Sequence, residues 1–205
     1  MSERANEAYG QHGVTWVDRF GVWLSSRAIK RSLPVGPSLR VLDVGCGYNA
    51  TLLMALGSKM TDGWGLDFQV NSDLRGKQGF TFVEGAVEET LPTVPRGHFD
   101  GVLIISVLEH LSDPLTALKI AHDALKPGGV LLVNVPTWRG KFFLEFSAFR
   151  LGLSPKTEMD DHKMYYDKRD LWPLLVRTGF KPSAIRLKYH KFGLNLFAVV
   201  RKTIA

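Results

Sequence analysis

The sequence predicts an α/β protein in which a doubly wound, mostly parallel sheet carries helices on both faces. Short apolar runs, such as residues 41–44 and 102–105, are typical of parallel strands that are buried on both faces. Segments with helical periodicity and recognisable caps separate these runs. A glycine turn follows the first run and leads into a helix, as in folds that bind ligands at the carboxyl ends of their strands.

Composition sets the size and setting of this fold. With 205 residues, 45% of them hydrophobic, the chain can bury one core, so we expect a single domain over 1–205. The N-terminal residues lack the apolar region of a secretory signal, and no run of about 18 apolar residues occurs. We therefore expect a cytoplasmic protein. The single cysteine, Cys46, excludes an internal disulfide, and its place in the glycine turn favours a small buried filler over a nucleophile.

The net charge of +6 is unevenly distributed. Residues 1–110 carry 10 Lys and Arg against 12 Asp and Glu, whereas residues 111–205 carry 16 against 8. The basic second half favours an acidic substrate or an anionic surface nearby. Solvated helix faces with scattered lysines explain it equally well, because no dense basic run occurs.

The first half of the chain contains the helical start and the turn. Residues 14–33 have apolar positions at helical spacing and predict one or two helices, which form an N-terminal cover over 1–38. In the turn, Gly45 and Gly47 permit conformations that a Cβ would block, and residues 50–56 predict the helix that follows. A ligand resting there would meet backbone N–H groups at a helix start, although such turns also occur as plain structure. Asp67 ends a second strand about 20 residues later, where an acidic side chain reaches a ribose hydroxyl pair.

The second half continues the alternation of strands and helices. A fourth strand begins at Phe99, and its exit, 106–110, should lie at the floor of the site. Asp113 and Pro114 should start a helix that ends near Leu125, followed by a fifth strand over 130–135. Asp167 should cap a further helix over 168–178 that ends at Gly179. The last two strands are expected at 181–189 and 194–201.

Five motifs in order then carry a family resemblance. They read RVLDVGCGYNATLLMAL, GWGLDFQ, FVEGAVEETLP, FDGVLIISVLEHL and LKPGGVLLVNVP. With these motifs the sequence resembles the class I S-adenosylmethionine-dependent methyltransferases, especially the small-molecule, type 11-like group with Glu-His-Leu after the fourth strand. The resemblance covers roughly residues 39–201. It implies a Rossmann-like sheet of seven strands with the last one antiparallel, the cofactor S-adenosylmethionine and the product S-adenosylhomocysteine.

The resemblance also implies a cofactor site in the core, 39–136. Asp43 occupies the family position that orients the turn and the methionine amino group. Asp67 occupies the position that accepts hydrogen bonds from the ribose, and Phe68 the position that packs on the adenine face. Two departures stand out. Asn49 replaces the third glycine, which asparagine tolerates because it accepts positive φ. Ala86 replaces the usual adenine-binding aspartate, so either affinity is lower or Glu88 substitutes. The implied cofactor contacts are Asp43, Gly45, Cys46, Gly47, Asp67, Phe68, Ala86, Val87, Ile105 and Ser106.

The acceptor side is less specified by the sequence. His110 and His162 are the candidate catalytic bases, because an imidazole titrates near neutral pH; for His110 a structural hydrogen bond is equally plausible. The exit sequence ISVLEHL lacks the Asn/Asp-Pro-Pro-aromatic pattern of base-methylating relatives, so no nucleic acid is expected. Ser106 replaces the first glutamate of the magnesium-binding Glu-x-x-Glu-His relatives, so no metal is expected. The candidate substrate contacts are Glu109, Tyr165, Tyr166, Phe142 and Phe146.

The aromatic insertion, 137–163, separates the core from a C-terminal part, 164–205. It predicts a lid over the substrate, a basic amphipathic surface that touches a membrane through 139–153, or a helix packed on the sheet edge. A sugar or other anionic metabolite is the expected methyl acceptor, with a lipid or quinone as the main alternative. The competing functions are a non-catalytic S-adenosylmethionine-binding partner protein and a nucleotide-dependent oxidoreductase, which the position of Asp43 before the turn argues against.

Overall fold

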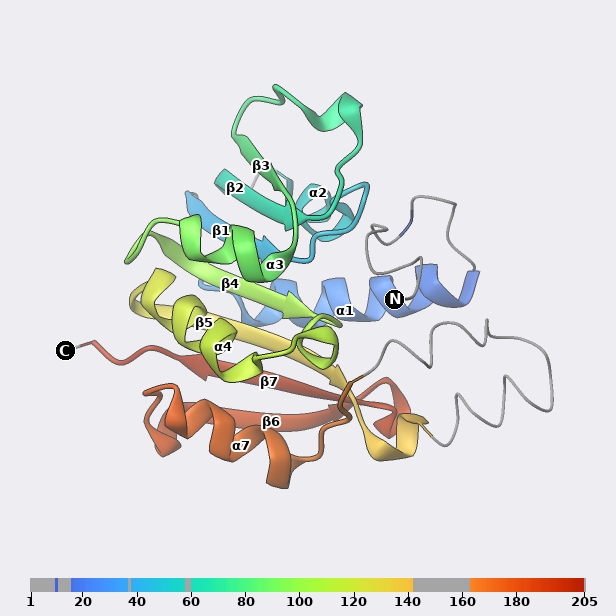
Figure 1. Ribbon diagram of the computed structural model, residues 1–205, viewed down its shortest axis with the longest axis vertical. Coiled ribbons are helices and arrows are strands. Elements are labelled where there is room, and N and C mark those ends of the chain that lie inside the picture. Colours follow the sequence, from blue (N-terminus) through green and yellow to red (C-terminus); the bar gives the residue numbers. More distant parts are fainter. Residues whose placement is uncertain (1–9, 11–15, 37, 58–59, 142–162, 205) are drawn as a thin grey trace.

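The computed structural model describes residues 10, 16–36, 38–57, 60–141 and 163–204, and within them a seven-stranded sheet of order β3-β2-β1-β4-β5-β7-β6 (Figure 1). Strand β7 runs antiparallel to both β5 and β6, and the other pairs are parallel. The predicted doubly wound sheet with an antiparallel last strand is therefore confirmed. The strands are β1 (Leu39–Val44), β2 (Met60–Asp67), β3 (Phe80–Glu84), β4 (Phe99–Ile105), β5 (Leu125–Pro136), β6 (Ile185–His190) and β7 (Asn195–Arg201).

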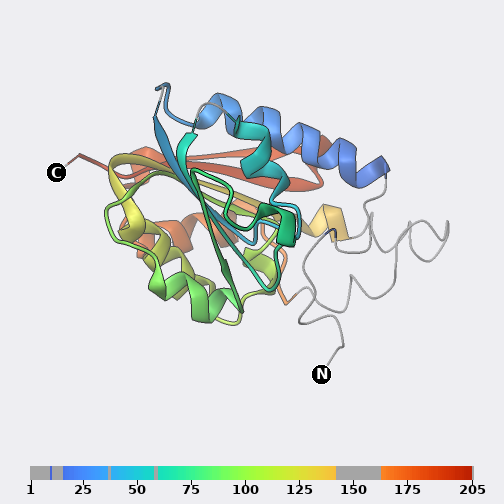
Figure 2. The same cartoon turned by 90° about the horizontal axis from the view of Figure 1, so that it is seen from above.

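Helices cover both faces of the sheet, as Figure 2 shows. Helices α1 (Trp16–Ser32) and α2 (Thr51–Leu56) lie on one face, and α3 (Val87–Thr90), α4 (Pro114–Ala124) and α7 (Lys168–Arg177) lie on the other. Successive strand residues point to opposite faces, which creates two buried clusters. Val41, Leu103 and Leu132 belong to the cluster under α1 and α2, whereas Leu42, Val102 and Val133 belong to the other.

The helix caps follow the sequence closely. Asp113 accepts a hydrogen bond from the Thr116 backbone N–H at 3.0 Å, with Pro114 at the first helical position of α4. Asp167 and Asp170 form a capping box at the start of α7. Both caps confirm the predicted starts of these helices.

Two strand boundaries differ from the prediction. Strand β5 already begins at Leu125, before the Pro-Gly-Gly turn, and its register to β4 shifts between Phe99 and Gly101. Residues 182–184, predicted as strand, form a short 3₁₀ turn (η6) because Pro182 cannot donate to a strand ladder. The remaining 3₁₀ turns are η3 (Ser72–Leu74), η4 (Leu91–Thr93), η5 (Leu108–His110) and η7 (Lys191–Gly193).

Part of the acceptor side falls beyond the described ranges. Phe142, Phe146 and His162 lie outside them, so the roles predicted for these residues and for the segment 139–153 stay predictions. In the parts that are described, no helix is both long and apolar enough to span a bilayer.

Candidate active site

The glycine turn connects β1 to α2 at the carboxyl edge of the sheet. Gly45 and Gly47 have φ values of 72° and 75°, and a Cβ on Gly45 would collide with the Cγ2 atom of Val107. Only glycine fits there. The expectation that Asn49 adopts the left-handed conformation is wrong: Ala50, at the N-cap of α2, has φ 44°. Asn49 instead uses its side-chain oxygen to accept from the Asn71 side chain at 3.1 Å.

The backbone N–H groups of this turn are directed into the protein. Gly45 and Cys46 both donate to the Leu66 carbonyl, at 2.8 and 3.0 Å. Gly47 donates to the Asp67 carboxylate at 2.7 Å. These three N–H groups are therefore paired with β2, whereas the predicted ligand contact concerns the N–H groups at the start of α2 and stays a prediction. What the turn offers is a close backbone approach beside two carboxylates, Asp43 and Asp67.

Asp43 is fully buried at the end of β1. Neither of its carboxylate oxygens accepts a hydrogen bond from any described residue. Burial, reinforced by the nearby charge of Asp67, raises the pKa of Asp43 well above its usual range. A buried carboxylate without a partner is costly, and a bound cation would relieve that cost.

Asp67 is held in a different way. Its Oδ2 accepts from Gly47 N–H at 2.7 Å, and its Oδ1 accepts from Phe68 N–H at 2.9 Å. Burial raises the pKa of Asp67, while these two N–H donors oppose the shift. Two of about four lone-pair positions are used, so the carboxylate can still accept from two hydroxyls.

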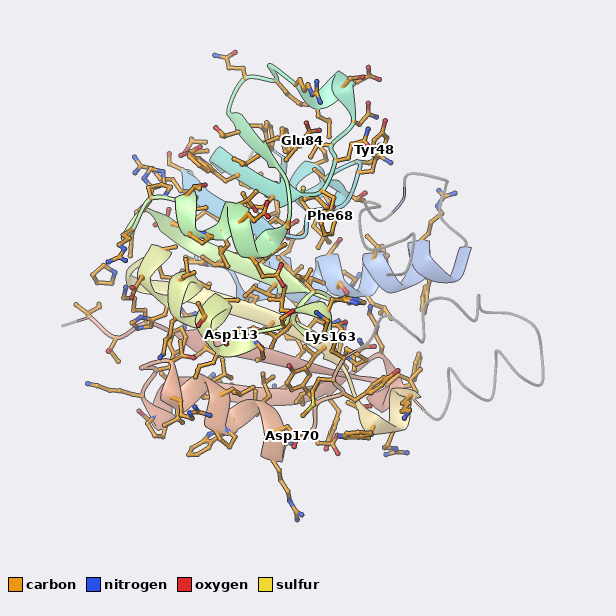
Figure 3. All side chains as sticks on the ribbon, in the orientation of Figure 1. Tyr48, Phe68, Glu84, Asp113, Lys163 and Asp170 are labelled. Atoms are coloured by element: carbon orange, nitrogen blue, oxygen red, sulfur yellow. The ribbon has the colours of Figure 1, made fainter. Side chains whose placement is uncertain are left out.

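Phe68 follows directly and is 37% exposed. Figure 3 shows it with Tyr48 on the turns beyond β1 and β2. The loop after Phe68 is anchored by Glu84, which accepts from Val70 N–H at 2.8 Å and pairs with Arg75 at 2.7 Å. Sequence reasoning missed Glu84. Its position opposite Asp67 on the neighbouring strand is what lets it anchor the loop after Phe68.

Ala86 precedes α3 as its N-cap and, like Val87, presents no side-chain acceptor there. The Glu88 carboxylate accepts from the Ser112 backbone N–H at 3.4 Å. Glu88 is therefore directed to the loop after η5 in this structure. To replace the missing aspartate as the adenine contact, Glu88 would have to break its hydrogen bond with Ser112.

The exit of β4 contains a strained serine. Ser106 has φ 57°, and its backbone N–H donates to the Asn134 carbonyl at 2.8 Å. The Asn134 side chain reaches Ser106 Oγ at 3.5 Å, while its own Oδ1 is buried without a described partner. Strain and an unpaired acceptor together are typical of a ligand site. Sequence reasoning missed Asn134, and the signal was a lone amide inside the apolar run VLLVNVP.

Glu109 lies just beyond this exit and is 1% exposed. Its Oε2 has no partner among the described residues, and burial raises its pKa to about 8. Tyr166 lies nearby, and burial together with the charge of Glu109 raises the pKa of its hydroxyl to about 12. Both groups are therefore buried and protonated at neutral pH.

Residues 163–166 pass from the exit of β4 to the end of β5. Lys163 N–H donates to the Glu109 carbonyl at 2.9 Å, and Tyr166 N–H donates to the Pro136 carbonyl at 3.0 Å. The Lys163 ammonium donates to Ser112 Oγ at 2.8 Å, and Figure 3 places it farther along the same edge than Phe68. Tyr165 is buried against Trp138, with ring centroids 5.6 Å apart.

The remaining predicted site residues divide between surface and core. His110 is exposed in η5 at the carboxyl edge, and Ile105 is half-buried beside the turn region. Cys46 is buried in the core cluster under α1, and burial raises its pKa, which confirms the filler interpretation. No three His, Cys, Asp or Glu side chains gather as metal ligands within the ranges that the structure describes.

These residues fit an adenosyl amino acid at the edge formed by β1, β2 and β4. Asp43 could hold its ammonium group, Asp67 its ribose hydroxyls, and Phe68 could cover one face of its base. The carboxylate of Asp43, whose two oxygens accept no hydrogen bond from a described residue, is the observation that favours a ligand with an ammonium group at this edge.

The comparisons with known proteins identify the family of the chain. The family model described as "Methyltransferase domain" matches residues 16–184. Relatives named "Ubiquinone biosynthesis O-methyltransferase" include one from Bordetella avium, 32% identical over 157 residues, which cover 72% of this chain and 64% of that protein. Another, from Xanthomonas campestris, is 32% identical over 106 residues, covering 48% of this chain and 43% of that protein. The chain thus spans less than two thirds of these relatives.

Solved structures share the fold at low identity. A chain in the complex between the Haloferax volcanii Trm112 methyltransferase activator and a methyltransferase has a TM-score of 0.71 at 15% identity, with 91% of both chains covered. An S-adenosylmethionine-dependent methyltransferase from Mesorhizobium loti has a TM-score of 0.63 at 17% identity, with 86% of this chain and 96% of that chain covered.

Proposed function

The chain belongs to the methyltransferase-domain family, and on that premise we propose that it transfers a methyl group from S-adenosylmethionine to an oxygen atom of a small-molecule acceptor. The observation that carries the proposal is the buried, unpartnered carboxylate of Asp43 beside the glycine turn. A nucleotide without an ammonium group would leave that carboxylate unpaired. An adenosyl amino acid would pair it.

The proposed division of labour follows from the positions of the side chains. When bound, S-adenosylmethionine supplies a methyl group already activated by its sulfonium. Asp43 and Asp67 would fix the two polar ends of the donor, and Phe68 would exclude water from its base. The strained Ser106 and the amide of Asn134 would line the space where the acceptor oxygen approaches.

A hydroxyl acceptor must lose its proton when its oxygen forms the new bond to carbon. His110 is exposed at the acceptor edge and remains a candidate base, together with His162. Glu109 is a poorer candidate, since it is buried beneath residues 163–166. With an acidic phenol as acceptor, alignment of the two reactants would supply most of the rate enhancement.

The proposed acceptor class is a phenol or hydroquinone of the type that precedes a quinone. The names of the curated relatives support this class over the sugar or anionic metabolite expected from charge. A sugar acceptor remains the second candidate on the basic charge of the second half.

Calorimetry with S-adenosylhomocysteine and with NAD tests the cofactor proposal directly. Binding of S-adenosylhomocysteine but not of NAD is the expected result, and binding of NAD alone would overturn the proposal. Transfer of a radiolabelled methyl group to a panel of catechols, hydroquinones and sugars then tests the acceptor. Cofactor binding without turnover on any of these would favour the non-catalytic partner role.

A further inference from the structure

An aromatic and basic surface surrounds the acceptor edge on the side of α1. It consists of Phe20, Trp23 and Arg27 on α1, Trp138 and Lys141 after β5, and Phe192 in η7. The aromatic members are exposed by 47% at Phe20, 51% at Trp23, 41% at Trp138 and 89% at Phe192. Large apolar side chains that gather in this way on a surface usually mark an interaction site.

Three segments that are distant in sequence and carry these residues lie next to one another. The Thr137 hydroxyl donates to the Gly193 carbonyl at 2.8 Å, which joins the turn after β5 to η7. A Cβ on Gly21 would lie 3.5 Å from the Lys191 ammonium, which places η7 against α1. Figure 1 shows the start of α1, η7 and the turn after β5 at the same end of the sheet.

The aromatic rings are paired with cations. Phe20 and Trp23 stack with centroids 5.8 Å apart, and the Arg27 guanidinium lies 5.0 Å from the Trp23 ring. The Lys141 ammonium lies 5.6 Å from the Trp138 ring. Phe192 and the residue before it, Lys191, both have left-handed backbone conformations, with φ values of 61° and 48°. Such strain in non-glycine residues usually serves a site.

The charge of the chain is concentrated in the same three segments. Residues 16–32, 136–141 and 185–195 contain nine Lys and Arg and one acidic residue, Asp18. The rest of the chain therefore holds 17 of the 26 basic residues and 19 of the 20 acidic ones. The excess positive charge of the chain therefore belongs to these three segments, which include the defined surface and extend beyond it.

We propose that the aromatic and basic surface docks on an anionic lipid bilayer. Exposed aromatic rings with Lys and Arg between them are what the interface of a bilayer stabilises, because the rings enter the headgroup region while the cations meet lipid phosphates. Docking in this position would bring the acceptor edge to the membrane. The importance of that placement rests on the proposed function, but the docking itself does not depend on it.

Sedimentation with lipid vesicles tests the proposal on the full chain without any cofactor. Vesicles of equal phosphatidylcholine and phosphatidylglycerol should bind the protein at least about tenfold more tightly than phosphatidylcholine alone, and added salt should weaken the binding. Phe192→Ser and Trp23→Ser should each weaken it at least about fivefold. Trp172→Ser is the matched control, because Trp172 is 41% exposed on α7, on the opposite face, and its loss should change nothing.

Three results would overturn the proposal. The first is no difference between anionic and neutral vesicles, and the second is an equal loss for Trp172→Ser. The third is a vesicle-free dimer that Phe192→Ser dissociates, which would assign the surface to a second copy of the chain. Unchanged melting temperatures of the variants show that each is folded. Calorimetry with S-adenosylhomocysteine separates this test from that of the proposed function, since vesicle binding without cofactor binding would leave the docking intact.

Discussion

The two edges of the sheet differ in whether their buried and half-buried polar groups have hydrogen-bond partners. At the amino edge, Asp62 accepts from the Trp64 indole at 2.9 Å and contacts His98 Nε2 at 2.8 Å. Asp100 there accepts from the Arg40 backbone N–H at 2.9 Å and from the Lys126 ammonium at 2.7 Å. Every oxygen of these two carboxylates has a donor beside it.

At the carboxyl edge, by contrast, Asp67 has both oxygens paired but several other buried polar atoms lack partners. Both oxygens of Asp43, Oε2 of Glu109 and Oδ1 of Asn134 are buried without a described hydrogen bond. Unpaired buried groups cost stability, and a fold retains them where a ligand can pair them. We infer from the difference that the amino edge stabilises the fold, and we propose that the carboxyl edge gives up stability for binding.

The largest expected effect concerns Glu109. Its pKa is raised from an ordinary 4.5 to about 8 in the folded protein, so the unfolded chain ionises first as pH rises. Folding stability should therefore fall between about pH 4.5 and 8 and level off above. Relative to wild type, Glu109→Gln should gain about 3 to 5 kcal/mol of unfolding free energy over that interval.

Urea unfolding at pH 5 and pH 8.5 measures this difference for Glu109→Gln. The exposed Glu89 on α3 supplies the control, since Glu89→Gln should show no comparable pH dependence. Parallel stability curves for Glu109→Gln and wild type would show that Glu109 is not held as a buried acid.

The second effect concerns Asp67 and would sharpen the contrast between the edges. Asp67→Ala should weaken S-adenosylhomocysteine binding by about 1.5 to 3 kcal/mol, the range for hydrogen bonds to a charged group. It also removes the acceptor of Gly47 N–H and so loosens the turn. Calorimetry should find Asp73→Ala, an exposed change in the neighbouring η3, without effect. Equal affinities for Asp67→Ala and wild type would exclude Asp67 from the site.

The smallest effect belongs to the amino edge. His98→Ala should lower the unfolding free energy by about 1 to 2 kcal/mol, because it removes the contact to Asp62 and the edge packing on Phe99. Cofactor affinity should not change, because this edge lies at the other end of the strands. If His98→Ala lowered cofactor affinity without lowering stability, the two edges would not differ in the way described.

The fold was predictable because its signals are local. Apolar runs, the glycines at 45 and 47, and the caps at Asp113 and Asp167 each depend on neighbouring residues in the sequence. The left-handed conformation falls at Ala50 and not at Asn49, and the N–H groups of Gly45, Cys46 and Gly47 are paired by β2, about 20 residues away in the sequence. Propensity alone does not contain that contact.

The residues of the candidate site could be predicted where a sequence motif contains them, but not where they come together only through strand pairing. Asp43 and Asp67 lie at the carboxyl edge as expected, but Asn134 joins Ser106 only through the pairing of β5 with β4. Likewise, the burial of Tyr165 and Tyr166 depends on residues 163–166 crossing the edge. Contacts of this kind follow from topology and leave little trace in the sequence.

The central claim is that the carboxyl edge holds Asp43 unpaired for the ammonium group of a ligand. Calorimetry of Asp43→Asn with two ligands tests it, because S-adenosylhomocysteine carries that ammonium and 5′-methylthioadenosine lacks it. We expect at least about a thirtyfold loss of affinity for the first ligand, little change for the second, and an apo protein at least as stable as wild type. Equal losses for both ligands, or none for either, would contradict it.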